Sequence, residues 1–124
     1  MGSLNYSILV VDDNVDYIDA FRYQIKTMLK DKLKRLDSAI NGKQAIELAH
    51  ENNYDYIFMD VNMPELDGIK ATEEIVKTNP DTNIIAVSSH KEMGYLKNML
   101  KAGAYYYIVK DDVEYKVIAN IFGM

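Results

Sequence analysis

The sequence contains no cysteine, which excludes disulfide bonds, thiolate nucleophiles and zinc–thiolate sites. It also lacks any apolar run near the roughly 20 residues that a transmembrane helix requires. Basic residues are too few to balance the acidic ones, since 14 Lys and Arg face 19 Asp and Glu. Because nucleic-acid affinity depends largely on neutralised phosphates, this balance argues against direct nucleic-acid binding. We therefore expect no contact with nucleic acid or membrane, and the lack of cysteine is compatible with a cytoplasmic location.

The length of 124 residues suits one domain with a single sheet and its covering helices. Hydrophobic residues make up 48% of the chain and charged residues 27%, which is the balance of a globular protein. No repeat, low-complexity segment or Pro/Gly/Ser-rich linker divides the sequence. We expect residues 5–124 to form this domain, and residues 1–4 to be a remnant of cloning rather than a secretory signal.

Short apolar segments alternate with helical periodicity five times along the chain. The apolar segments predict strands over residues 7–12, 35–39, 56–60, 83–88 and 105–110. The second is too polar for a central strand, so we expect it at an edge of the sheet. Helical spacing in the first intervening segment joins Val15, Ile18, Phe21, Ile25 and Leu29 into one apolar stripe.

Residues typical of helix ends stand at the boundaries of the predicted helices. The expected N-caps are Asn14, Asn41, Asp67 and Asp112, and Gly103 is an expected C-terminal cap. Strands that alternate with helices imply a parallel sheet with helices on both faces. Five such units predict an α/β fold with a doubly wound five-stranded parallel sheet, flavodoxin-like, in strand order 2-1-3-4-5. Ligands in this fold bind beyond the carboxyl ends of the strands, where the first and third strands meet.

Polar residues with useful chemistry follow four of the predicted strands. Asp12 and Asp13 end the first strand, Asp60 the third, Ser88 the fourth and Lys110 the fifth, so all five meet at one edge. Clustered carboxylates repel one another unless a cation lies among them, and oxygen ligands suit Mg²⁺ or Mn²⁺. A carboxylate, a divalent ion and a lysine around a phosphate predict phosphoryl transfer, with an acyl phosphate as one outcome. Each residue alone also fits a helix cap, a turn or a solvated surface; the agreement of four strand ends favours the site.

Five segments together resemble the receiver domain of bacterial two-component response regulators. They are ILVVDDN (8–14), NGKQAIELA (41–49), YIFMDVNMPELDGIKAT (56–72), NIIAVSS (83–89) and KAGAYYYIVK (101–110). Asp111 after Lys110, and DGIKAT at 67–72, are similar to receivers of the NarL/LuxR type, which carry a DNA-binding helix-turn-helix domain. The resemblance therefore implies control of transcription through a domain outside this chain, with a stand-alone single-domain regulator as the alternative.

The resemblance also implies a role for each acidic residue. Asp60 matches the acceptor of a phosphoryl group from a sensor histidine kinase or phosphotransfer protein. Asp13 matches a direct Mg²⁺ ligand, and Asp12 a residue that acts on the ion mainly through water. Asp60 and the backbone carbonyl of Asn62 complete the implied metal site, with Mn²⁺ as a substitute ion.

Further positions match the residues that read out phosphorylation in the family. Ser88 and Lys110 match the groups that bind phosphoryl oxygens, and Tyr107 matches an aromatic switch that turns inward when Ser88 moves. Ser89 is small, as access to the acceptor requires, and His90 stands where the family tunes the lifetime of the acyl phosphate. The resemblance implies an output face on the fourth helix, fifth strand and fifth helix, which is also the implied homodimer face.

The same residues argue against three alternative functions. The resemblance implies a signalling module, with at most self-phosphorylation from small donors and self-dephosphorylation as activity. A haloacid-dehalogenase-like phosphatase would need an acidic residue at the position of Asn62. A flavodoxin would need a phosphate-binding loop where residues 12–14 place two carboxylates. A receiver that works without phosphorylation would not need the complete set of acids, hydroxyl and lysine.

Overall fold

The computed structural model describes residues 5–61, 63, 67–89, 94–110 and 115–124. Its strands form one five-stranded parallel sheet in the order β2-β1-β3-β4-β5, which confirms the predicted fold class and strand order. The strands are β1 (Tyr6–Val11), β2 (Leu33–Ala39), β3 (Tyr56–Asp60), β4 (Asn83–Ser88) and β5 (Tyr106–Val109). The helices are α1 (Val15–Leu29), α2 (Gly42–Glu51), α3 (Gly68–Thr78), α4 (Leu96–Ala102) and α5 (Tyr115–Ile121), and the 3₁₀ turn η1 (Lys30–Lys32) joins α1 to β2.

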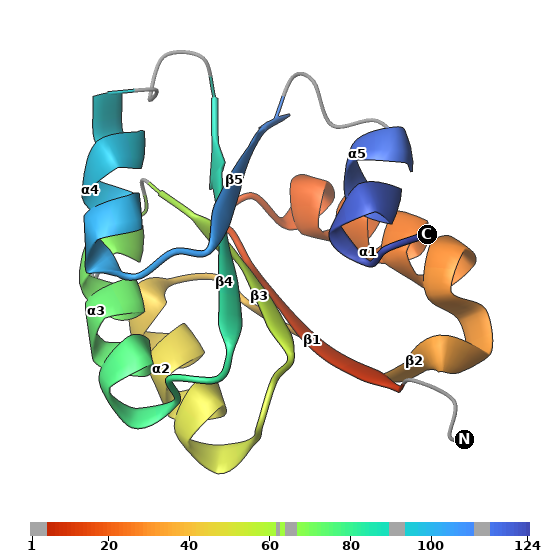
Figure 1. Ribbon diagram of the computed structural model, residues 1–124, viewed down its shortest axis with the longest axis horizontal. Helices are drawn as coiled ribbons and strands as arrows, with labels where there is room; N and C mark the ends of the chain where they lie inside the picture. The colour runs from red at the N-terminus through yellow and green to blue at the C-terminus, as the bar shows by residue number, and fades with distance from the viewer. Residues whose placement is uncertain (1–4, 62, 64–66, 90–93, 111–114) are drawn as a thin grey trace.

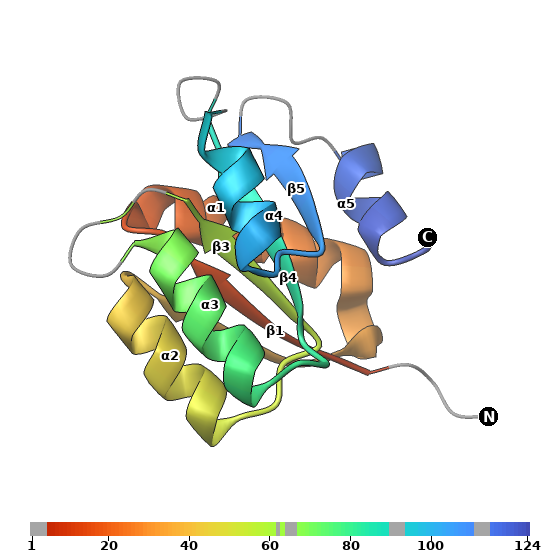
Figure 2. The same ribbon diagram turned by 60° about the vertical axis from the view of Figure 1, so that its left-hand side comes forward.

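The helices cover both faces of the sheet, so the molecule has three layers. Helices α1 and α5 lie on one face, and α2, α3 and α4 lie on the other (Figures 1 and 2). Alternation along β1 divides its side chains between two cores. Ile8 and Val10 pack with the α1 side, whereas Leu9 and Val11 pack with the α2 side. A central strand buried on both faces explains the continuous apolar run in the sequence.

The predicted boundaries of the strands were nearly right. β3 and β4 match the prediction, while β1 and β5 each end one residue earlier, so Asp12 and Lys110 lie just beyond their strands. β2 is the predicted edge strand but begins earlier, at Leu33, because Leu33 pairs with Tyr6 of β1 despite the polar residues around it. Within the described part of the chain, no helix has the length and apolar character to cross a bilayer.

Three of the predicted N-caps make the expected hydrogen bond. The side chains of Asn14, Asn41 and Asp67 accept from the third backbone N–H beyond them, at 3.1, 2.8 and 2.9 Å. Asp112 lies outside the described residues. Gly103 ends α4 with a φ of 122°, as its predicted capping role requires. The placement of Val15 in the apolar stripe was wrong: it lies in the exposed first turn of α1 and is 57% exposed.

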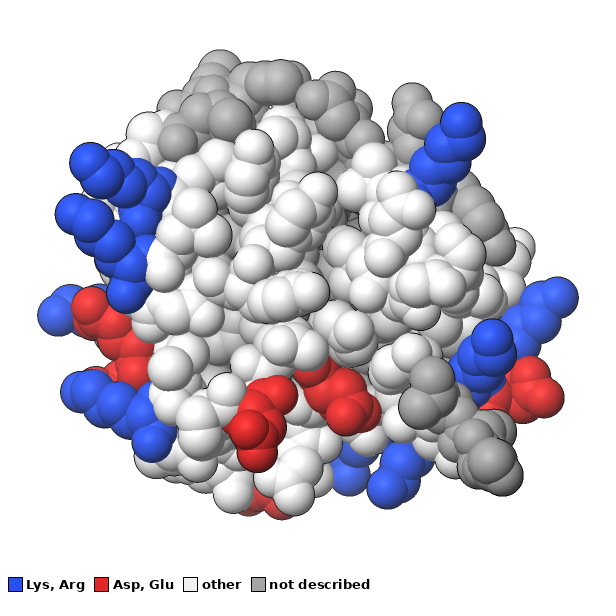
Figure 3. Space-filling model, in the orientation of Figure 1, with Lys and Arg blue, Asp and Glu red and all other residues white. Residues whose placement is uncertain are grey.

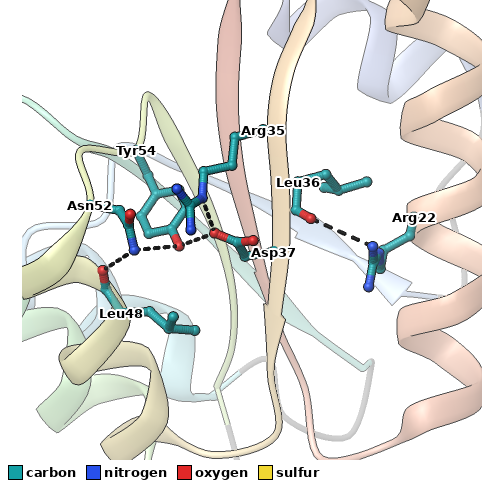
Figure 4. A network of polar contacts seen from close by, with 7 residues as sticks. All are labelled: Arg22, Arg35, Leu36, Asp37, Leu48, Asn52 and Tyr54. Atoms are coloured by element: carbon teal, nitrogen blue, oxygen red, sulfur yellow. Dashed lines mark hydrogen bonds and ion pairs between the residues drawn. The ribbon is translucent and has the colours of Figure 1, made fainter.

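A polar network fastens the edge strand β2 to the neighbouring layer. Asp37 accepts hydrogen bonds from Arg35 Nε at 2.5 Å and from the hydroxyl of Tyr54 (Figure 4). Asn52 extends the network by donating to the backbone oxygen of Leu48 at 3.1 Å. Burial opposes ionisation of Asp37, but the hydrogen bonds from Tyr54 and Arg35 outweigh it and lower the pKa of this carboxyl.

Candidate functional site

The three carboxylates predicted to meet at the sheet edge do so. Asp12 continues the β1–β2 ladder by donating its backbone N–H to Ala39 O at 3.1 Å, and its Oδ1 accepts from the N–H of Asn14 at 2.9 Å. Asp60 is the last residue of β3, beside β1. Oxygen atoms of Asp12, Asp13 and Asp60 lie within 4.8 Å of one another. The side chains of Asp12 and Asp60 are buried, whereas Asp13 is exposed, so the cluster opens toward solvent on one side.

Lys110 reaches this cluster from the end of β5. Its Nζ lies 2.7 Å from Asp12 Oδ2 and 3.7 Å from Asp60 Oδ1. Asp12 is thus the closer of the two partners, and both carboxylates are buried. Among the residues that the structure describes, one ammonium faces three carboxylates, which leaves a net negative charge that a cation can balance.

The pKa of Asp12 depends on burial and on the charges around its carboxyl. Burial raises the pKa of the Asp12 carboxyl above its usual value. The ion pair with Lys110 and the hydrogen bond from Asn14 act in the opposite direction, and the negative charge of Asp13 adds to the rise. Burial and Asp13 thus oppose the ionisation of Asp12 more strongly than Lys110 and Asn14 favour it.

The donor set fits a hard divalent cation. Three carboxylates supply only oxygen ligands, which Mg²⁺ and Mn²⁺ prefer. Such ions usually take few protein carboxylates and keep several waters, so an exposed side of the cluster leaves room for a phosphate. Asn62, whose backbone carbonyl is predicted to complete the metal site, lies outside the described residues.

The predicted switch residues occupy two different environments. Ser88 ends β4 and is fully buried, and its Oγ has no hydrogen-bond partner within the described part of the chain. An unpaired buried hydroxyl is costly, so this one is ready for an acceptor at the site. Tyr107 on β5 is 40% exposed, so its ring lies on the outside of the molecule. Ser89 follows at half-buried depth, and His90 lies outside the described residues.

Sequence reasoning missed two residues beside the site. Gly68 begins α3, and a Cβ at this position would overlap the backbone oxygen of Asp60. The backbone N–H of Gly68 donates to Val61 O at 3.1 Å. Only glycine allows this close approach. The signal in the sequence was the position of Gly68 directly after the predicted N-cap Asp67. Tyr17 on α1 lies beneath the ammonium of Lys110, with Nζ 4.7 Å from the ring centroid. Tyr17 is outside the apolar stripe, so periodicity gave no hint of it.

Known proteins are similar to this chain in sequence. Residues 8–121 match the model of the response regulator receiver domain. The chain is 36% identical to the chemotaxis protein CheY of Thermotoga maritima over 108 residues, which covers 83% of each protein. It is 31% identical to the transcriptional regulatory protein DegU of Brevibacillus brevis over 106 residues, or 84% of this chain and 43% of DegU. The chain thus spans less than half the length of DegU.

Solved structures agree with the sequence relatives. The receiver domain of sensor histidine kinase PA1611 from Pseudomonas aeruginosa PAO1 superposes with a TM-score of 0.82 at 29% identity, covering 94% of this chain and 93% of that one. That structure has a magnesium ion coordinated in its active site cleft. The receiver domain of the histidine kinase CKI1 from Arabidopsis thaliana, complexed with Mg²⁺, gives a TM-score of 0.80 at 30% identity and covers 97% and 92% of the two chains. This chain belongs to the response regulator receiver domain family of two-component signalling.

Proposed function

We propose that Asp60 accepts a phosphoryl group in a Mg²⁺-dependent reaction and that the domain signals by the resulting change of conformation. The observation that carries this proposal is the placement of the Lys110 ammonium between two buried carboxylates, Asp12 and Asp60. The donor is a phosphohistidine on a sensor histidine kinase or phosphotransfer protein. Small donors such as acetyl phosphate serve in its place, and the bound phosphoryl group is lost again by hydrolysis.

The metal would be held by the carboxylates of Asp13 and Asp60 and by the backbone carbonyl of Asn62, with Asp12 acting through water. The incomplete charge balance around Asp12 supports this assignment, as does the Mg²⁺ in the active site cleft of the PA1611 receiver domain. When bound, the ion supplies positive charge that lets an anionic phosphoryl group approach a carboxylate.

Besides the metal and the donor, transfer uses Asp60, Lys110 and Ser88, which lie at the carboxyl edge of the sheet. A carboxylate oxygen of Asp60 attacks phosphorus, an O–P bond forms, the N–P bond of the phosphohistidine breaks, and the imidazole leaves. The ammonium of Lys110, 3.7 Å from Asp60 Oδ1, then pairs with a phosphoryl oxygen. The buried hydroxyl of Ser88 donates to another oxygen, which satisfies a group that has no partner in the described part of the chain.

The output is carried by the face formed from α4, β5 and α5. Ser88 moves toward the phosphoryl group, and the half-exposed ring of Tyr107 turns into the space behind it. Charged side chains lie mainly at the margin of this face, and its exposed apolar side chains include Leu100, Tyr105 and Tyr106 (Figure 3). Such a surface suits a second copy of the chain, so we expect phosphorylation to favour a homodimer through it.

Residues 5–124 form the receiver unit, without nucleic-acid or membrane contacts of its own, and act in the cytoplasm. DegU is a transcriptional regulatory protein more than twice as long as its matched segment, which supports control of transcription through a DNA-binding domain. CheY of Thermotoga maritima matches over 83% of its length and supports the alternative of a stand-alone regulator.

The direct test is the intact mass of the protein after incubation with acetyl phosphate and Mg²⁺. We expect a gain of one phosphoryl group, about 80 Da, in the wild type and none in Asp60→Asn or in the presence of a chelator. Asp13→Ala should weaken Mg²⁺ binding by at least about tenfold, because it removes a direct ligand. Unchanged Mg²⁺ affinity in Asp13→Ala would overturn the metal assignment, and phosphorylation of Asp60→Asn would overturn the acceptor.

A further inference from the structure

The aromatic ring of Tyr17 lies against the ammonium that the proposed reaction uses. Lys110 Nζ is 4.7 Å from the centroid of this ring, within the distance at which a cation is attracted to an aromatic face. The same Nζ is 2.7 Å from Asp12 and 3.7 Å from Asp60. The ammonium is therefore held on two sides, by carboxylates and by the face of an aromatic ring.

The ring of Tyr17 is fixed by the core rather than by the site. It stacks on Phe21, one turn further along α1, with centroids 5.8 Å apart and planes 11° apart. Phe21 in turn meets the edge of Phe58 at 4.9 Å, and Phe58 is buried in β3, two residues before Asp60. Three aromatic rings in successive contact, one pair stacked and the other T-shaped, thus connect the strand that carries Asp60 to the ammonium of Lys110.

The hydroxyl of Tyr17 does not explain its position. This oxygen is buried and has no hydrogen-bond partner among the described residues. Burial, together with the negative charges of Asp12 and Asp60, raises the pKa of the phenol far above neutrality, so the side chain stays uncharged. An unpaired buried hydroxyl is a cost, whereas the ring gains from its stacking on Phe21 and from its contact with the ammonium.

We propose that Tyr17 is a positioning residue for Lys110, whose ring holds the ammonium between Asp12 and Asp60, ready to pair with an arriving phosphoryl group. The inference rests on the proposed function. A lysine stem has four flexible carbons, so an ion pair with Asp12 alone leaves the distance between ammonium and Asp60 variable. The rigid ring removes part of this freedom before the phosphoryl group arrives.

The test compares Tyr17→Leu, which removes the ring, with Tyr17→Phe, which keeps it. We expect phosphorylation from acetyl phosphate with saturating Mg²⁺ to slow about fivefold in Tyr17→Leu, as loss of a partly buried cation–π contact predicts. Tyr17→Phe should restore most of the rate and raise thermal stability, because it removes only the unpaired hydroxyl. The matched control is Tyr23→Leu on the same helix, whose side chain is 73% exposed and which should leave the rate unchanged.

A double-mutant cycle separates positioning from general damage. In a Lys110→Ala background, Tyr17→Leu should cause no further loss, since the ammonium it positions is gone. An equal loss in both backgrounds, or a Tyr17→Leu variant as fast as the wild type, would overturn the proposal. A wild type that gains no phosphoryl group at all would instead overturn the proposed function.

Proton NMR tests the contact without any phosphoryl transfer. The Cε protons of Lys110 should be shifted upfield by the ring current in the wild type and in Tyr17→Phe, and should move to ordinary positions in Tyr17→Leu. This measurement holds even where Tyr17→Leu is poorly folded, because unshifted Cε protons in the wild type and in Tyr17→Phe already contradict the contact.

Discussion

At the scale of single residues, Asp12 is a buried carboxylate whose surroundings oppose its ionisation. Its side chain is 1% exposed, and burial raises its pKa in spite of the ammonium 2.7 Å away. A folded-state pKa above the unfolded value means that the folded protein binds a proton more tightly. Stability is therefore lost as the pH rises from the ordinary value of an aspartate through the raised pKa of Asp12.

Asp12→Asn should stabilise the metal-free protein at pH 7 by roughly 1 kcal/mol, because a neutral amide avoids the burial of charge. The gain should vanish at acid pH, where Asp12 is protonated in the folded wild type. Urea unfolding in the presence of a chelator, at several pH values, measures this difference. Asp13→Asn is the control, since Asp13 is exposed and should show little effect. A less stable Asp12→Asn at pH 7 would contradict the assigned cost.

The polar residues of the site could be predicted from their positions at the ends of strands, but the contact of Lys110 with the ring of Tyr17 could not. Asp60 and Ser88 end their strands, and Asp12 and Lys110 follow theirs directly. The apolar runs of these strands are visible in the sequence, so topology brings the four residues to one edge of the sheet. Tyr17 lies on a helix and meets Lys110 only through the packing of α1 on the sheet. Such a contact depends on side-chain positions in three dimensions, which hydrophobic periodicity does not encode.

At the scale of elements, the junction between β3 and α3 depends on Gly68. The close approach of Gly68 to the Asp60 backbone leaves no space for a side chain. Gly68→Ala should therefore destabilise the fold by about 2 kcal/mol and slow phosphorylation, because backbone atoms beside the acceptor must move. Thermal unfolding and the rate of phosphoryl gain measure the two effects.

Gly94→Ala is the matched control for this prediction. A Cβ on Gly94 meets nothing within 4 Å, so the substitution should be neutral. Equal stability of Gly68→Ala and Gly94→Ala would contradict the role assigned to the close approach.

A polar network contributes to the attachment of the edge strand β2. Tyr54→Phe removes the hydroxyl that donates to Asp37 and should cost about 1–2 kcal/mol at pH 7. The lowered pKa of Asp37 means that this stabilisation is present above the ordinary pKa of an aspartate and is lost as the pH falls through the folded-state value. The difference between wild type and Tyr54→Phe should therefore shrink on acidification.

Urea unfolding at neutral and acid pH measures this trend, with Tyr23→Phe as a control whose hydroxyl is on an exposed side chain. A cost that is the same at both pH values would show that ionised Asp37 is not the partner that matters.

The polar character of β2 also explains why its start could not be predicted. Pairing of Leu33 with Tyr6, not local hydrophobicity, sets that boundary.

At the scale of the whole molecule, the carboxyl edge of the sheet and its two faces have different roles. Its carboxyl edge gathers charge, while the two faces supply separate cores that hold the strand ends in register. The face over α4, β5 and α5 carries few charges in its centre (Figure 3). The family assignment follows from this whole arrangement, since the match covers residues 8–121.

The most direct test of the account is to identify the residue that carries the phosphoryl group. The protein is incubated with acetyl phosphate and Mg²⁺, the acyl phosphate is reduced with borohydride so that the modified aspartate becomes homoserine, and peptides are mapped by mass spectrometry. The account predicts homoserine at position 60, with Asp12 and Asp13 unchanged. Homoserine at position 12 or 13, or an intact Asp60 in protein that has gained a phosphoryl group, would contradict it.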